Sequence, residues 1–173
     1  RPRYPVARDE SLESAIEMIY EAKMPLVLIG AGANRTRIGN AMKDFIDKLE
    51  IPFFMTQMGK GVVDEFHPLC LGTAALSDND YLHCAIERAD LIINVGHDII
   101  EKPPFFMHKD KTKVIHINFL PSDVDATYFP QLDIVGDIAC NLKSLTRLST
   151  KQEHWDFSYY MRIIEESQEH IKK

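Results

Sequence analysis

The sequence has few cysteines and no long apolar run, and both shortages narrow the classes of protein to which it can belong. Cys70, Cys84 and Cys140 are odd in number and show no C-x-x-C spacing, which argues against a disulfide framework and a thiolate zinc site. The longest apolar run, residues 25–30, is far shorter than the ~20 residues of a membrane span, and no secretory signal opens the chain. We therefore expect a cytoplasmic protein whose three cysteines, each with apolar residues close by in the sequence, pack in the interior.

Basic residues are also scarce. Lys and Arg number 20 against 26 for Asp and Glu, so the formal net charge is −6. No basic stripe is present to neutralise phosphates, which excludes nucleic acid and anionic membranes as expected partners. A length of 173 residues with 45% hydrophobic residues is enough for about one globular domain.

The common catalytic motifs are missing as well. The dinucleotide pattern G-x-G-x-x-G fails because Arg35 stands where its third glycine belongs, and the P-loop pattern fails because Gly61 follows Lys60. No G-x-S-x-G elbow and no H-E-x-x-H pair occurs. We therefore predict no catalytic residue and no metal ligand in this chain.

What the sequence does contain is a regular alternation of strand and helix patterns. Apolar runs of strand length cover residues 25–30, 51–55, 69–72, 89–96, 113–118 and 132–137, and helical spacing covers 10–23, 38–49, 78–88 and 138–148. Strands that are apolar on both faces belong to parallel sheets covered by helices on each side. The fold class predicted is α/β, a three-layer, Rossmann-like open parallel sheet of about six strands.

The two ends of the chain differ from this central unit. Residues 1–9 hold two prolines and are predicted to be an interdomain linker, residues 10–150 form the domain, and residues 151–173 form a helical connector. Trp155 and Tyr159 are four residues apart on the expected connector helix, where they dock on this domain or on a neighbouring one.

Glycine-containing loops follow several of the predicted strands. They comprise Gly30–Gly32, Gly59–Gly61, Gly72 and Gly96–Asp98. Ligands of open α/β sheets bind beyond the carboxyl ends of the strands, so four such loops favour a nucleotide-type crevice, whereas each loop alone is explained by a tight turn. His97 ends a strand at this edge and either lines the pocket or caps the loop, while His116 lies inside a strand as a hydrogen-bonded core residue.

In their order and spacing these segments resemble the central domain of thiamine-diphosphate enzymes of the acetolactate synthase type. The matching segments are Pro25–Ala33, Ile51–Phe53, Thr56–Gly61, His67–Pro68, Leu71–Gly72, Ala89–Gly96, Val114–Asn118 and Asp133–Asp137. The resemblance implies a longer enzyme with an N-terminal pyrimidine-binding domain and a C-terminal diphosphate-binding domain. That enzyme decarboxylates pyruvate on thiamine diphosphate and condenses the product with a second 2-oxo acid, as a homo-oligomer. Thiamine diphosphate and Mg²⁺ belong to the missing domains, so this chain alone is expected to be inactive.

In biosynthetic members of that family the middle domain holds FAD. Carried over by position, the residues around it are Gly30, Ala31, Gly32, Thr56, Met58, Gly59, Lys60, Gly61, Gly72, Gly96, His97, Asp98, Asn118, Gly136 and Asp137, with Asn118 and Asp137 at the adenosine end. Residues 71–76 and 96–104 depart from the flavin-binding pattern, and residues 116–130 are more similar to the flavin-independent, catabolic type. FAD or ADP binding therefore stays open at this point.

Two alternatives also stay open. The chain is either a free-standing flavin- or nucleotide-binding module of related fold, or the middle domain of another thiamine-diphosphate decarboxylase or carboligase. The strand-end glycines favour the first alternative. The second stays open because the middle domains of thiamine-diphosphate enzymes carry few residues that distinguish one substrate from another.

Overall fold

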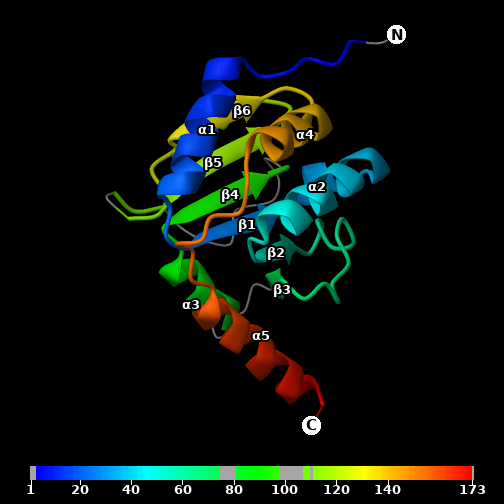
Figure 1. Cartoon of the computed structure of the whole chain (residues 1–173), viewed down its shortest axis with the longest axis vertical. Helices are drawn as coiled ribbons and strands as arrows, with labels where there is room; N and C mark the ends of the chain where they lie inside the picture. The colour runs from blue at the N-terminus through cyan, green and yellow to red at the C-terminus, as the bar shows by residue number, and fades with distance from the viewer. Residues whose placement is uncertain (1–2, 75–80, 98–106, 110, 173) are drawn as a thin grey trace.

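Six strands form one parallel sheet in the computed structural model of the chain (Figure 1). The structure describes residues 3–74, 81–97, 107–109 and 111–172. The strands are β1 (Pro25–Ile29), β2 (Phe53–Thr56), β3 (Cys70–Ala74), β4 (Leu91–Val95), β5 (Lys113–Asn118) and β6 (Leu132–Val135). They lie in the order β3-β2-β1-β4-β5-β6, and each neighbouring pair is parallel. The predicted open parallel sheet is confirmed.

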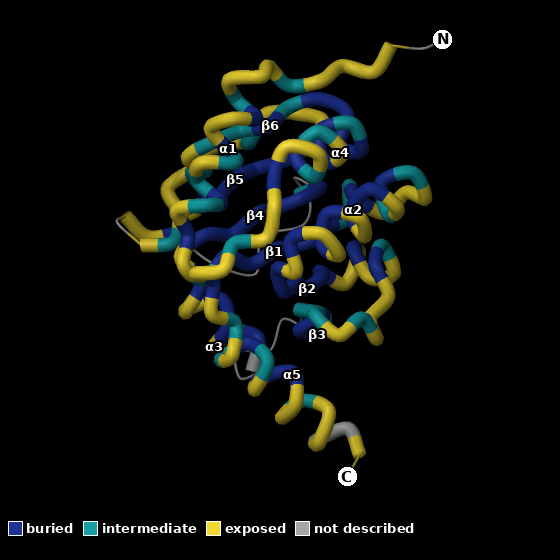
Figure 2. The backbone as a smooth tube through the Cα atoms, in the orientation of Figure 1, coloured by how far each residue is buried: buried dark blue, intermediate teal, exposed yellow. Residues whose placement is uncertain are grey.

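Helices cover both faces of this sheet. They are α1 (Asp9–Glu21), the short 3-10 turn η1 (Ala31–Ala33), α2 (Thr36–Leu49), α3 (Tyr81–Arg88), α4 (Ile138–Leu148) and α5 (Ser158–Ile171). Alternate residues of a strand point to opposite faces, so Val27 and Ile29 pack with α1, α2 and α4, whereas Leu26 and Leu28 pack with α3 and α5. Figure 2 shows the resulting buried strands between exposed outer helix surfaces. The apolar runs of the sequence are thus explained by burial on both sides.

The strand order changes direction beside β1. From β1 the chain continues to β2 and β3 on one side, and later to β4, β5 and β6 on the other. Between β1 and β4 lies the topological switch point, where open α/β sheets usually form their ligand crevice. The loops after β1 and β4 are therefore the first place to look for a site.

The C-terminal segment docks on the domain instead of extending away as one long helix. Trp155 is buried and donates its indole N–H to the carbonyl of Ala22 at 3.0 Å, and the hydroxyl of Tyr160 donates to the carbonyl of Met24 at 3.3 Å. Trp155 therefore docks on this domain, one of the two predicted possibilities, but helix α5 begins only at Ser158, so the prediction that Trp155 lies on the connector helix is wrong. Within the described ranges, no helix combines the length and apolar composition that a bilayer crossing needs.

Candidate nucleotide-binding edge

The loops after β1 and β4 touch each other at the switch point. The amide of Gly30 donates to the carbonyl of Val95, and the amide of Gly32 donates to the carbonyl of Gly96, both at 2.8 Å. A Cβ placed on Gly32 would lie 2.9 Å from the carbonyl oxygen of Gly96. These glycines allow the two loop backbones to pack closely together, and this contact alone is a structural reason for glycine at both positions.

The loop after β2 is closed in a similar way. The amide of Gly59 donates to the carbonyl and to the Oγ1 of Thr56, both at 3.1 Å, and a Cβ on Gly59 would clash with the carbonyl of Ile29. Met58 is exposed, and Lys60 is exposed and pairs with Glu65 at 3.2 Å. Gly59 and Thr56 therefore shape the turn, while Met58 and Lys60 point to solvent.

At the end of β5, Asn118 uses both ends of its side-chain amide within the chain. Its Nδ2 donates to the carbonyl of His97, and its Oδ1 accepts from the amide of Phe119 at 2.8 Å. The structure thus brings Asn118 and His97 together, as their positions at adjacent strand ends predict.

Asp137, at the end of β6, is the most strongly bound of the predicted residues. Its Oδ2 accepts from the amide of Cys140 at 2.9 Å and so caps the N-terminus of α4, while its Oδ1 accepts from Nη1 of Arg37 at 2.7 Å. Burial alone would raise the pKa of this carboxyl, but the hydrogen bonds from Arg37 and Cys140 outweigh it and lower the pKa to about 2. Asp137 is therefore an anion with both oxygens engaged.

Of the remaining predicted residues, Gly72 and Gly136 have positive φ angles of 123° and 137°. A side chain on Gly72 would meet only open space, whereas one on Gly136 would lie 2.7 Å from the carbonyl of Pro5. Ala31 lies in the η1 turn, and Gly61 is exposed with φ 93°. Asp98 lies outside the described residues.

Sequence reasoning missed a buried polar cluster on β4 and β5. The hydroxyl of Tyr128 accepts from Nδ2 of Asn94 at 2.9 Å and shares a hydrogen bond of 2.8 Å with Nδ1 of His116. The ring of His97 lies 5.0 Å from that of Tyr128, between centroids. Asn94 and His116 are register partners on neighbouring strands, but Tyr128 is 34 residues from Asn94, so only the fold reveals the cluster. The prediction that His116 is a hydrogen-bonded core residue is correct.

This cluster makes the stability of the domain depend on pH. Burial lowers the pKa of His116, and the charge of Asp133 only partly opposes this effect. Because the pKa of His116 is lower in the folded domain than in the unfolded chain, the unfolded chain binds a proton at this side chain more readily. The free energy of unfolding is therefore highest above about pH 6.5 and decreases as the pH falls below that value. Urea unfolding at about pH 7.5 and about pH 5.5 is expected to show a larger loss for the wild type than for His116→Gln. The exposed His108→Gln variant should behave like the wild type; equal losses in all three proteins would contradict this assignment.

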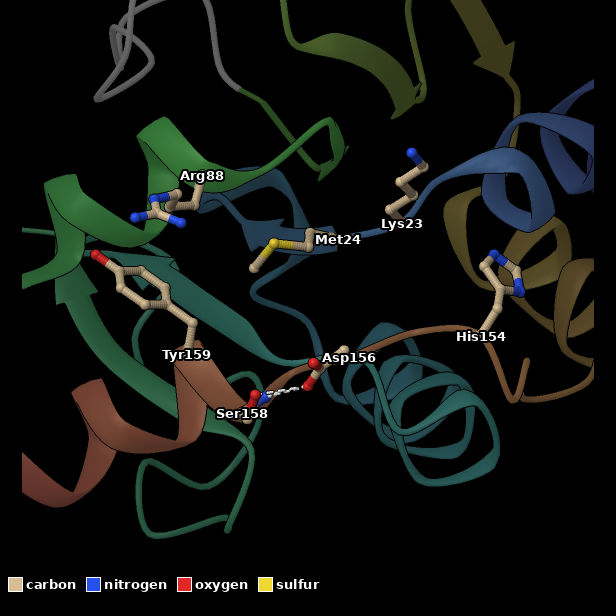
Figure 3. A pocket seen from close by; sticks show the side chains of 7 residues that line it. All are labelled: Lys23, Met24, Arg88, His154, Asp156, Ser158 and Tyr159. Carbon is tan, nitrogen blue, oxygen red and sulfur yellow. Dashed lines mark hydrogen bonds between the residues drawn. The ribbon is translucent and has the colours of Figure 1, made fainter.

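Among the surface pockets formed by described residues, two lie beside the ends of the strands. One, of about 310 Å³, lies at the start of α2 between the loops after β1 and β2, and of the predicted residues Gly61 lines it, together with Arg35, Lys43 and Asp64 among others. A larger one, of about 460 Å³, lies at the opposite, amino-terminal edge of the strands. Figure 3 shows its side chains coming from the turn before β1, from α3 and from the segment entering α5, with the guanidinium of Arg88 4.7 Å from the ring centroid of Tyr159. The larger pocket is therefore not at the predicted site.

The cysteines correct one prediction. Cys70 is buried, but Cys84 is exposed and Cys140 is half-buried. Cys84 lies on the outer face of α3 because Ala85 and Ile86 occupy the inner face of that amphipathic helix. Within the described residues, no group of three or more His, Cys, Asp or Glu side chains is placed to hold a metal ion.

The residues assigned to FAD by resemblance do not fit its adenosine half. Asn118 and Asp137, the two residues placed at the adenosine end, already make side-chain hydrogen bonds within the chain. An adenosine at Asp137 and Asn118 would compete with these partners, and buried polar groups are costly to leave unpaired.

Comparison with known proteins relates this chain to thiamine enzymes. Residues 12–148 match the family described as the central domain of thiamine pyrophosphate enzymes. The acetolactate synthase of Bacillus subtilis (strain 168) is 29% identical over 155 residues, which make up 88% of this chain and 27% of that protein. The acetolactate synthase large subunit of Cyanidium caldarium is 30% identical over 144 residues, or 82% of this chain and 24% of that protein.

A differently named relative also aligns with the chain. A 3D-(3,5/4)-trihydroxycyclohexane-1,2-dione hydrolase of Clostridium perfringens is 27% identical over 165 residues, covering 92% of this chain and 25% of that protein. Among solved structures, one described as a thiamin diphosphate-dependent enzyme from Mycobacterium smegmatis superposes with a TM-score of 0.71 at 23% identity, over 89% of this chain and 30% of that one. The chain thus spans about a quarter of the length of the curated relatives that it matches.

Proposed function

Because the chain belongs to the family of thiamine pyrophosphate enzyme central domains, we propose that it is the middle domain of an acetolactate synthase-like enzyme. The observation that carries this proposal is the family match over residues 12–148, together with acetolactate synthases of about 30% identity, of which the aligned part makes up only 27% and 24%. The activity, substrates and remaining domains of the whole enzyme are part of the proposal.

In that enzyme this chain serves as a scaffold. The other domains bind thiamine diphosphate and Mg²⁺, decarboxylate pyruvate and condense the product with a second 2-oxo acid. Residues 3–8 and 151–172 are the linkers to those domains, and both are fixed on the domain surface by specific hydrogen bonds. A cytoplasmic, homo-oligomeric enzyme is part of the same proposal.

The test compares this chain with the longer protein that contains it. Both are incubated with pyruvate, thiamine diphosphate and Mg²⁺, and the products are identified by NMR. The proposal predicts acetolactate from the longer protein and none from the chain alone. Acetolactate from the chain alone would contradict the scaffold role, and its absence from the longer protein would contradict the assigned reaction.

A second candidate is the middle domain of a different thiamine-dependent enzyme. The similarity to the cyclic-dione hydrolase favours it, since a second such hydrolase, of Geobacillus thermodenitrificans, is 38% identical over 87 residues. Turnover of a trihydroxycyclohexane-1,2-dione by the longer protein, without acetolactate formation from pyruvate, would select this candidate.

A further inference from the structure

The N-terminal segment of the chain lies on the turn between β6 and α4. The amide of Asp137 donates to the carbonyl of Pro5 at 2.7 Å, and the amide of Ala7 donates to Oδ1 of Asn141 at 3.0 Å. Gly136 makes room for this approach, because any Cβ there would lie 2.7 Å from the Pro5 carbonyl oxygen. Residues 4–7 are therefore held by a fitted surface.

Arg37, from the first turn of α2, contacts both the N-terminal segment and the turn between β6 and α4. Its guanidinium donates to Asp137 at 2.7 Å and to Sγ of Cys140 at 3.2 Å, and its Cζ lies 4.0 Å from the centroid of the Tyr4 ring. A guanidinium that pairs with a carboxylate in its plane is still able to stack on an aromatic ring through its face. Arg37 thus joins three separate parts of the chain: α2, the start of α4 and the N-terminal segment.

The N-terminal segment provides a hydrogen-bond donor for the buried side chain of Asn141. This residue is fully buried, and its Oδ1 accepts from Ala7, while its Nδ2 has no hydrogen-bond partner. If the segment left, the oxygen of a side chain that already has one unpaired group would lose its partner too. The surface around Asn141 therefore favours continued occupancy by the segment.

We propose that the edge of the sheet assigned by resemblance to the adenosine end of a nucleotide is instead the docking surface for residues 4–7 of the chain, locked by Arg37, and that FAD and ADP do not bind there. Asp137 is the residue common to both roles. Its amide, its two carboxylate oxygens and the adjacent Gly136 are all engaged by the segment, Arg37 and Cys140. Nucleotide and segment are therefore mutually exclusive at this edge.

Hydrogen exchange of the 173-residue chain tests the lock. In Arg37→Ala, peptides covering residues 4–8 are expected to exchange roughly tenfold faster or more, because the stacking of Arg37 on the Tyr4 ring is lost and Asp137, whose amide holds the Pro5 carbonyl, loses its charged partner. Arg35→Ala is the matched control, since this exposed arginine is two residues away and the charge change is the same. Tyr4→Ala, at a position that is 49% exposed, should also accelerate exchange without a risk to the core. Unchanged exchange in both Arg37→Ala and Tyr4→Ala would overturn the proposed lock.

Flavin binding tests the exclusion. The wild-type chain is mixed with FAD, or with ADP in a parallel titration, passed over a gel-filtration column and examined by absorption. We expect no nucleotide to remain with the protein. Stoichiometric retention of FAD or ADP by the wild type, with residues 4–8 still protected, would overturn the assignment of this edge. Both tests use only the chain itself, so their outcomes do not depend on which reaction the longer protein catalyses.

Discussion

Replacing Gly96 with alanine is expected to destabilise the domain by about 3 kcal/mol or more, because the substitution adds strain to a closed contact. Gly96 has φ 73°, which an L-residue rarely adopts, and a Cβ there would lie under 3.0 Å from the backbone nitrogen of Ala33. That obstacle is backbone and cannot rotate away. Chemical unfolding monitored by circular dichroism measures the loss.

Gly61→Ala is the control that separates the two causes. Gly61 also has a positive φ, 93°, but nothing lies within 4 Å of its Cβ position. We expect a loss of only about 1 kcal/mol, the cost of the backbone conformation alone. Equal losses at positions 61 and 96 would contradict the claim that the loops after β1 and β4 are packed against each other.

Tyr128→Phe is the second substitution with a large expected effect. It removes the hydroxyl that Asn94 and His116 share, so two buried polar groups lose their partner. Each buried group without a hydrogen bond costs about 1–3 kcal/mol, so a total loss of about 2–4 kcal/mol is expected in urea unfolding.

Tyr159→Phe provides the comparison for this second substitution. Tyr159 is half-buried, and its ring, which contacts Arg88, is kept by the change. Its free energy of unfolding should stay within about 0.5 kcal/mol of the wild type. If Tyr128→Phe were equally mild, the buried cluster would not contribute to stability as its geometry indicates.

The fold was predictable because its signals are local. Strands such as Pro25–Ile29 and Leu91–Val95 are continuous apolar runs between helical patterns, and these patterns alone indicate a parallel sheet with helices on both faces. The glycines after the strands were also recognisable, and in the structure Gly32 and Gly96 let the loops after β1 and β4 approach each other closely. Strand-end glycine by itself cannot tell a phosphate cradle from a backbone contact.

The side-chain contacts made by the predicted site residues join parts of the chain that are far apart in the sequence. Arg37 and Asp137 are 100 residues apart, and neither residue has a sequence neighbour that indicates the pairing. The same holds for Trp155 and Ala22, which are 133 residues apart, and this contact explains why Trp155 lies outside α5. Asp137 was correctly placed at the carboxyl edge, but its partners could be known only after folding.

If this domain is a scaffold whose strand-end edge is occupied by its own N-terminal segment, as we propose, the longer protein freed of flavin should remain active. Its rate of acetolactate formation from pyruvate, with thiamine diphosphate and Mg²⁺ supplied, is measured with and without added FAD. We expect full activity without FAD and no increase when FAD is added. Activity that appears only with FAD, and flavin that copurifies in equal amount with the protein, would contradict this expectation.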